Sequence, residues 1–215
     1  MTEIALISEG ITDQAIIESI LYCLTNGEAI AKPLRPLRDA TDNSRVAKNE
    51  FSNWELVREY VRSEEILDAI GTNDFVVIQI DTDQCEHPNF GIKQGKTMQI
   101  ESLVQACIDK ILSWLPARFP KSERHRLIFA IPVLSSECWL VSLHDPKHKH
   151  TSKTINNCEQ RLSKILKKSV AKEYIVYQKL SADFKKRKVL ERTAEATPCL
   201  KLFTEQVKAK IATSP

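Results

Sequence analysis

The order of apolar and polar residues predicts strands and helices that follow one another along the first 145 positions. Residues 4–7 form a short apolar run, which is typical of a buried strand. After it, apolar residues recur at helical spacing up to Leu24, with Thr12 as the expected N-cap and Asn26-Gly27 as the stop. The same alternation predicts strands at 75–80 and 126–131, a strand or loop at 29–37, and helices at 54–70, at 98–115 and from about residue 136.

Beyond residue 145 the pattern favours helices. Helical spacing predicts helices at 158–171, 182–196 and 198–211, with a short extended piece at 174–177. Strands that alternate with helices, as in the first part, favour a mainly parallel sheet covered on both faces. The sequence therefore predicts an α/β domain over residues 1–145 and a basic, mostly helical C-terminal extension over residues 146–215.

Three acidic residues lie where predicted strands end. Glu9 follows the first strand, and Asp81 and Asp83 follow the most apolar one; open parallel sheets bind ligands at these carboxyl ends. Side chains at i and i+2 of an extended chain point to the same side, so Asp81 and Asp83 can hold one ion. Carboxylate oxygens favour Mg²⁺ or Mn²⁺, with Glu9 as a further ligand or as a general acid or base. The alternatives are a hydrogen-bonded turn at 81–83 and a surface carboxylate at Glu9.

The stretches "ISEGITD" and "VVIQIDTD" resemble the two motifs of the TOPRIM domain, which topoisomerases, bacterial primases, OLD-family nucleases and small RNA maturases share. Glu9 and Gly10 match the first motif, and Asp81 and Asp83 match the second. The resemblance covers about residues 1–145 and implies a Rossmann-like fold. It also implies that the glutamate acts as general acid or base and that the aspartates hold Mg²⁺.

Two further acidic residues extend this resemblance. OLD-like and maturase proteins often have Glu-Gly-x-x-Asp in the first motif, and Asp13 stands at that place, either as a metal ligand or as a favourable charge at a helix N-terminus. "SSECWLVS" is similar to a Glu plus Trp-Leu helix in small TOPRIM-like bacterial proteins, which implies that Glu137 faces the same cleft; the alternative is a plain helix-terminal glutamate. Topoisomerases usually carry Asp-x-Asp-x-Glu, whereas Gln84-Cys85-Glu86 follows here, so the small nuclease branch fits better.

Charge is distributed unevenly along the chain. The formal net charge is +3, yet residues 147–192 hold 14 Lys or Arg against 4 Asp or Glu, which leaves the other positions net acidic. A basic segment beside an acidic one suggests contact with a polyanion, and the alternative is a solvated lysine-rich helix face. We expect DNA or RNA to bind Lys164, Lys167 and Lys168, which share one predicted helical face, Lys185, Lys186, Arg187 and Lys188 on the next helix, and Lys93 and Lys96 in the loop after Asp83.

Six cysteines occur without a CxxC pair, which predicts free or buried thiols. The alternative is a zinc site, whose spacing would match no common zinc finger. The candidate zinc ligands are Cys85 with His87, or His144, His148, His150 and Cys158.

The chain contains neither a run of 18 apolar residues nor a signal-peptide pattern, which predicts a cytoplasmic protein without a membrane span.

The leading interpretation is a Mg²⁺- or Mn²⁺-dependent nuclease that hydrolyses phosphodiester bonds of DNA or RNA, with Glu9, Asp81 and Asp83 at its centre. Family association suggests a role in bacterial phage defence. One alternative is a TOPRIM-like module without catalysis that works beside a partner protein such as an ATPase. Another is a phosphatase that acts on a small substrate.

Overall fold

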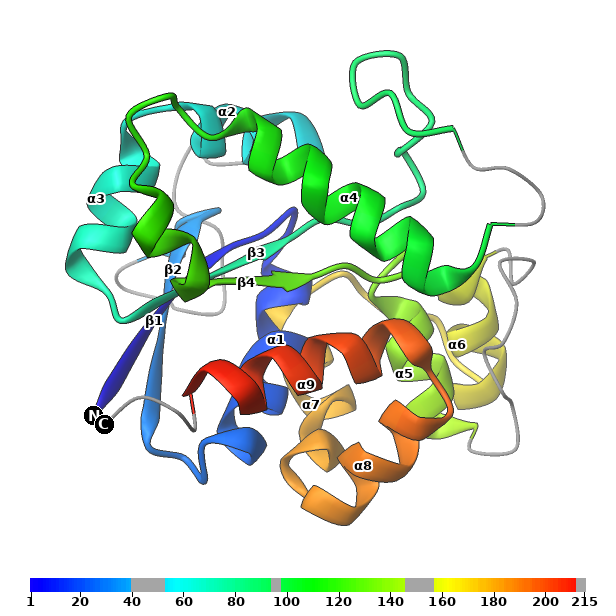
Figure 1. Cartoon of the computed structure of the whole chain (residues 1–215). Helices are drawn as coiled ribbons and strands as arrows, with labels where there is room; N and C mark the ends of the chain where they lie inside the picture. Colours follow the sequence, from blue (N-terminus) through cyan, green and yellow to red (C-terminus); the bar gives the residue numbers. More distant parts are fainter. Residues whose placement is uncertain (40–52, 94–97, 146–156, 212–215) are drawn as a thin grey trace.

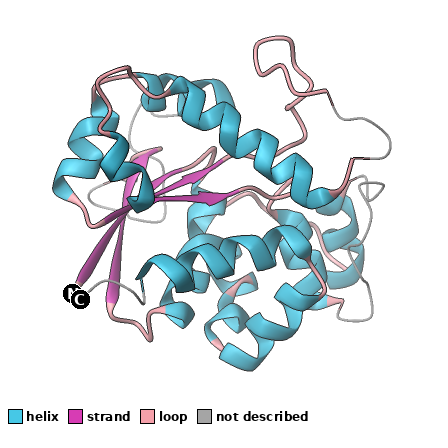
Figure 2. Ribbon diagram, viewed as in Figure 1, coloured by secondary structure: helices cyan, strands magenta, loops and turns pink. Residues whose placement is uncertain are grey.

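Parallel strands form the centre of the molecule in the computed structural model, which describes residues 1–39, 53–93, 98–145 and 157–211 (Figure 1). Within these ranges the sheet has four strands in the order β2-β1-β3-β4, and each neighbouring pair is parallel. Helices flank the sheet, so the predicted α/β architecture with a parallel sheet is confirmed (Figure 2). The strands are β1 (Thr2–Ile7), β2 (Ala29–Arg35), β3 (Phe75–Gln79) and β4 (Leu127–Ala130).

The register of the sheet brings the carboxyl ends of β1 and β3 together. Ile7 of β1 pairs with Ile78 of β3. Glu9 and Asp81 therefore lie just beyond the carboxyl ends of two neighbouring strands. The last four residues of β1 and most of β3 are fully buried, as expected for parallel strands covered on both faces. The predicted neighbourhood of these two strand ends is therefore confirmed.

The chain after β3 keeps pairing with the chain after β4. The Thr82 N–H donates to the Pro132 carbonyl (3.2 Å), and the Asp83 N–H donates to the Leu134 carbonyl (3.1 Å). The Leu134 N–H in turn donates to Thr82 Oγ1 (2.8 Å), from a backbone in the left-handed region (φ 68°). These bonds continue the pairing of the two chain segments beyond the ends of β3 and β4.

Helices lie on both faces of the sheet (Figure 1). The apolar faces of these helices and the strands share one continuous buried core. Over one face lie α2 (Trp54–Arg62), α3 (Glu65–Thr72) and α4 (Ile100–Trp114), and over the other lie α1 (Ile11–Leu24) and the C-terminal helices.

The described part of the C-terminal segment is helical and packs on the rest of the chain. Helix α7 lies against α1, and α9 lies against β4, α4 and α1. On the outer edge of β4, Gln206 Oε1 accepts from the Phe129 N–H (3.1 Å) and Gln206 Nε2 donates to the Phe129 carbonyl (3.2 Å). The domain boundary near residue 145 stays a prediction. The elements in this part are α5 (Glu137–His144), α6 (Cys158–Leu166), α7 (Tyr174–Leu180), α8 (Arg187–Glu195) and α9 (Pro198–Ile211), with short 3₁₀ segments η1 (Lys121–Arg126) and η2 (Ala182–Lys185).

Ser63 interrupts the single helix predicted over residues 54–70, so that prediction was wrong. The Ser63 backbone is extended (φ −82°, ψ 174°) and closes α2. Its Oγ accepts from the Glu65 N–H (3.2 Å) at the start of α3. A serine hydroxyl can thus replace the helical backbone bond, and apolar spacing alone does not report this competition.

The predicted helix over 158–171 was also too long. Helix α6 ends at Leu166, because Lys167 adopts the left-handed conformation (φ 53°) that commonly closes a helix. The predicted helix over 182–196 is divided at Lys186, whose extended backbone (φ −92°, ψ 112°) separates η2 from α8.

Residues 174–177 are helical rather than extended, which is a further correction. Within α7, Tyr174 and Tyr177 are three positions apart and share one buried face. The Tyr174 hydroxyl donates to Glu18, and the Tyr177 hydroxyl donates to Glu137 Oε1 (2.8 Å). Contacts with two distant elements therefore decide the conformation of this short segment.

In the described ranges, no helix is both long enough and apolar enough to cross a membrane.

Candidate active site

A pocket of about 750 Å³ opens at the carboxyl ends of β1 and β3. All five predicted acidic site residues line it, although they come from three separate segments of the chain. Glu9 and Asp81 are half-buried, Asp13 and Glu137 are buried, and Asp83 is exposed at the rim. The structure thus brings together Glu9, Asp13, Asp81, Asp83 and Glu137, and adds Asn53, Glu159 and Lys172 to the same lining.

Glu9, Gln79 and Asp81 form a closed ring of three hydrogen bonds. The Glu9 N–H donates to Gln79 Oε1 (3.0 Å), and Gln79 Nε2 donates to Asp81 Oδ1 (2.7 Å). The Asp81 N–H closes the ring by donating to Glu9 Oε1 (2.7 Å). Gln79 is the last residue of β3 and is fully buried, so the two carboxylates are oriented by a rigid part of the sheet.

Gly10 leaves room for Asp13 at the start of α1. Gly10 is the N-cap of this helix, which corrects the prediction that Thr12 has this role. A Cβ on Gly10 would lie 3.2 Å from Asp13 Oδ2, closer than most real contacts of this kind. Asp13 Oδ1 accepts from Ser136 Oγ (2.5 Å) in the segment before α5. Asp13 therefore points into the acidic cluster while it also stands in the first helical turn.

Glu137 is held in the pocket wall by Tyr177, whose hydroxyl donates to it. Lys172 Nζ lies 4.0 Å from Glu137 Oε1 and 2.9 Å from Glu159 Oε2. Among the described lining residues, Lys172 supplies the positive charge. Sequence reasoning missed it, because Lys172 lies outside the lysine clusters that helical spacing selects. Its position between a helix end and two tyrosines was the one available signal.

Burial and mutual repulsion raise the pKa values of four of these carboxyl groups, those of Glu9, Asp13, Asp81 and Asp83. Burial, followed by the charges of Asp13 and Asp83, raises the pKa of Glu9 to about 8, against opposing hydrogen bonds from backbone N–H groups. Burial and the Glu137 charge raise the pKa of Asp13 to about 7. Burial, then the charges of Asp13 and Glu9, holds the pKa of Asp81 well above its usual range, and burial raises that of Asp83. A cluster of this kind favours protons or a cation.

The chemistry of the cluster suits a hard divalent cation. The lining acids offer only oxygen donors, which Mg²⁺ and Mn²⁺ prefer. Over the described residues, however, no three His, Cys, Asp or Glu side chains stand as a preformed metal-binding group. Glu9, Asp13, Asp81 and Glu137 each accept a hydrogen bond from a protein donor.

The predicted nucleic-acid residues near the pocket do not form the expected helical face. Lys164 lies on α6, but Lys167 and Lys168 follow its end, so the prediction of one shared face was wrong. Lys93 is exposed in the loop after Asp83 and does not line the pocket. Lys96 lies outside the described residues.

The second basic cluster, Lys185 to Lys188, lies at the far end of α1. Arg187 Nη2 donates to the Cys23 carbonyl (3.2 Å) and to Asn26 Oδ1 (3.3 Å). Lys186 pairs with Asp183 (2.8 Å), and Lys185 Nζ lies 5.1 Å from the centre of the exposed Tyr22 ring. At 1.5 Å per helical residue, Cys23 is roughly 15 Å along α1 from Asp13. The structure therefore separates this cluster from the carboxylates.

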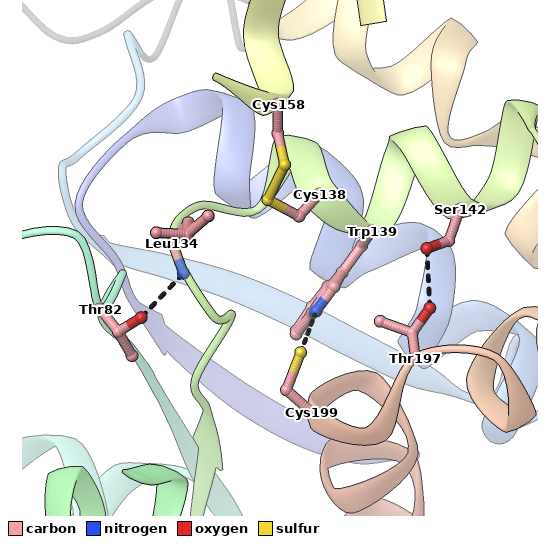
Figure 3. The surroundings of a disulfide bond; sticks show 8 residues. All are labelled: Thr82, Leu134, Cys138, Trp139, Ser142, Cys158, Thr197 and Cys199. Carbon is pink, nitrogen blue, oxygen red and sulfur yellow. Dashed lines mark hydrogen bonds between the residues drawn. A yellow bond between two sulfur atoms is a disulfide. The ribbon is translucent and has the colours of Figure 1, made fainter. Parts of the chain in front are cut away.

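Cys138 and Cys158 form a disulfide, which corrects the prediction of free thiols for this pair (Figure 3). The bond joins α5, directly after Glu137, to the first residue of α6, directly before Glu159. It therefore connects two walls of the pocket. The described free cysteines, Cys23, Cys85, Cys107 and Cys199, are buried as predicted.

The disulfide also removes one candidate zinc site. Cys158 has no free thiolate, and His144 Nε2 lies 3.0 Å from the Leu180 carbonyl. His148 and His150 lie outside the described residues. In the other candidate pair, Cys85 is fully buried, and the His87 ring packs at a tilt of 56° against Trp54, with centroids 5.4 Å apart.

Comparisons with protein-family models, with curated proteins and with solved structures find no match for this chain.

Proposed function

We propose that this chain is a TOPRIM-like, Mg²⁺- or Mn²⁺-dependent nuclease that hydrolyses phosphodiester bonds of DNA or RNA. The observation that carries the proposal is the pocket in which Glu9, Asp81 and Asp83 meet at the carboxyl ends of two adjacent parallel strands. This is the place where open parallel sheets bind their ligands. The resemblance of the same residues to the TOPRIM motifs points to the same chemistry.

In this proposal Asp81 and Asp83 hold the divalent cation, and Asp13 and Glu137 add negative charge or further ligands. Such a cation, when bound, polarises a phosphoryl oxygen and lowers the pKa of water. Glu9 acts as general acid or base, because its carboxylate lies in the same pocket and accepts from the Asp81 N–H. Lys172, which lies in the pocket lining beside Glu137 and Glu159, contacts a substrate phosphate.

The substrate class follows from the combination of a cation site with basic surface. Lys164, Lys167, Lys168 and Lys93 are exposed and provide contacts to a phosphate backbone outside the pocket. The cluster from Lys185 to Lys188 is roughly one helix length away and would contact a longer polymer. The resemblance to OLD-like proteins extends the proposal to bacterial phage defence.

One observation favours a second candidate, a TOPRIM-like module without catalysis that works beside a partner such as an ATPase. The carboxylates of Glu9 and Asp81 are engaged by protein donors, and the described residues contain no preformed metal-binding group. A decayed site would keep such bonds and bind no cation.

A cleavage assay separates the two candidates. End-labelled single-stranded DNA, duplex DNA and RNA are incubated with the protein and Mg²⁺, Mn²⁺ or chelator, and the products are resolved by size. We expect metal-dependent cleavage of one polymer, reduced by about 10²-fold or more in Glu9→Gln and Asp81→Asn. Glu101→Gln, on the exposed side of α4, is the matched control and keeps full activity. Equal cleavage by wild type and Asp81→Asn would leave the module without catalysis as the better account.

A further inference from the structure

The ring formed by Glu9, Gln79 and Asp81 depends on a single side chain that belongs to neither acidic motif. Gln79 accepts from the Glu9 N–H (3.0 Å) at one end of its carboxamide and donates to Asp81 Oδ1 (2.7 Å) at the other. It contributes no charge and is fully buried. It therefore reaches both strand ends from inside the sheet.

The orientation of this carboxamide is determined by its partners. A backbone N–H can only donate, so the Gln79 oxygen faces Glu9 and its NH₂ group faces Asp81. A leucine would fill a similar volume but offers neither bond. A glutamate of the same length could accept from Glu9, yet it would repel an ionised Asp81.

The hydrogen bonds of the ring hold the Glu9 and Asp81 carboxylates in place before a ligand binds. Asp81 donates its own N–H to Glu9 Oε1 (2.7 Å), so each residue of the ring fixes the next. Without Gln79, the Glu9 backbone and the Asp81 carboxylate would each lose a partner in a half-buried pocket, where neighbouring charges push the carboxylates apart.

We propose that Gln79 is a positioning residue, whose buried carboxamide holds Glu9 and Asp81 in register so that they present their carboxylates to a divalent cation as one unit. The part of this inference that concerns the divalent cation rests on the proposed metal-dependent function. Groups that orient metal ligands in this way commonly change affinity by about 10- to 100-fold when they are removed.

Amide hydrogen exchange and Mn²⁺ binding test the proposal without an activity assay. In Gln79→Leu without metal, the Glu9 and Asp81 amides should exchange at least about tenfold faster, while the Ile78 amide inside the sheet stays protected. Titration calorimetry should show Mn²⁺ affinity about 10- to 100-fold below that of wild type.

Gln206→Leu is the matched control. Gln206 likewise makes two hydrogen bonds through its carboxamide, to the N–H and carbonyl of Phe129 on the edge strand β4, and it does not line the acidic pocket. This variant loses two equivalent hydrogen bonds, so its Mn²⁺ affinity and its Glu9 and Asp81 exchange rates should equal those of wild type. Gln79→Glu preserves side-chain length, and it should keep the Glu9 amide slow even if Gln79→Leu folds poorly.

The failures can be told apart. The positioning role of Gln79 is overturned if the Glu9 and Asp81 amides exchange at the wild-type rate in Gln79→Leu. It is also overturned if the Glu9 amide of Gln79→Glu exchanges as fast as in an unfolded peptide. A folded wild-type protein that binds no Mn²⁺ overturns the proposed function, whatever the exchange rates show.

Discussion

The backbone N–H of Asp81 donates a hydrogen bond to the Glu9 carboxylate, with 2.7 Å between Asp81 N and Glu9 Oε1. These residues are 72 positions apart in the sequence, and the bond forms because β1 and β3 are adjacent and parallel. The two acidic motifs are therefore one structural unit. The negative charge that gathers there has consequences for stability as well as for chemistry.

Removing one charge from the pocket should stabilise the metal-free protein. Asp13→Asn keeps an acceptor for Ser136 Oγ and removes a charge that raises the pKa values of Glu9 and Asp81. We expect the melting temperature at pH 8 without metal to rise by about 2–4 °C, equivalent to about 1 kcal/mol of relieved repulsion. Differential scanning calorimetry measures this change. A lower melting temperature would mean that the Asp13 charge is already compensated.

The stability of the metal-free protein should fall as the pH rises. Glu9 and Asp13 have folded-state pKa values raised from 4.5 to about 8 and from 3.8 to about 7, so the folded state binds protons more tightly than the unfolded state. Their contribution is complete below pH 4 and is lost as the pH rises through 7 and 8. We predict a melting temperature roughly 5–10 °C lower at pH 8 than at pH 5. Adding Mg²⁺ at pH 8 should restore part of the lost melting temperature. A melting temperature that does not change between pH 5 and pH 8 would contradict the raised pKa values of Glu9 and Asp13.

Breaking the disulfide should loosen one wall of the pocket. Helix α6 packs mainly on α5, and the bond between Cys138 and Cys158 ties their beginnings together across 20 positions of sequence. Cys158→Ser should lower the free energy of unfolding by about 2–3 kcal/mol, measured by urea titration. Added reductant should have no effect on Cys158→Ser, which lacks the bond, whereas the control Cys107→Ser replaces a buried free cysteine on α4, keeps the bond and should respond to reductant as wild type does. Equal stability of wild type with and without reductant would show that the bond contributes nothing.

Lys172 should matter more for cleavage than other exposed lysines. It lies in the pocket beside Glu137 and Glu159, whereas Lys208 on α9 pairs with Glu191 on α8 and does not line the pocket. We expect Lys172→Met to reduce cleavage by about 10²-fold or more and Lys208→Met to leave it unchanged. Melting curves of both variants check that folding is intact. Full activity of Lys172→Met would place the substrate phosphate elsewhere.

Much of the parallel sheet and of the acidic cluster could be predicted from the sequence, because both rest on short-range signals. Apolar runs mark the buried strands, and the acids at 9, 81 and 83 follow directly from the strand ends. Gln79 and Lys172 could not be predicted in this way. Gln79 is a polar residue inside an apolar strand, and its partner Glu9 is 70 positions away.

The helix boundaries and the disulfide also depend on tertiary contacts. Ser63 divides a helix through one side-chain bond, and Tyr174 and Tyr177 make a short segment helical through bonds to Glu18 and Glu137. The pairing of Cys138 with Cys158 requires α5 and α6 to be neighbours. None of these relations leaves a periodic pattern in the sequence.

Anomalous diffraction from a crystal of the protein soaked in Mn²⁺ tests the central claim most directly, since it locates the cation without assuming an activity. The account predicts a manganese peak in the pocket, in contact with Asp81 and at least one of Glu9 and Asp83, and no such peak in Asp81→Asn. A well-ordered pocket without manganese, in which the Asp81 N–H still donates to Glu9 and Gln79 still donates to Asp81, would contradict it.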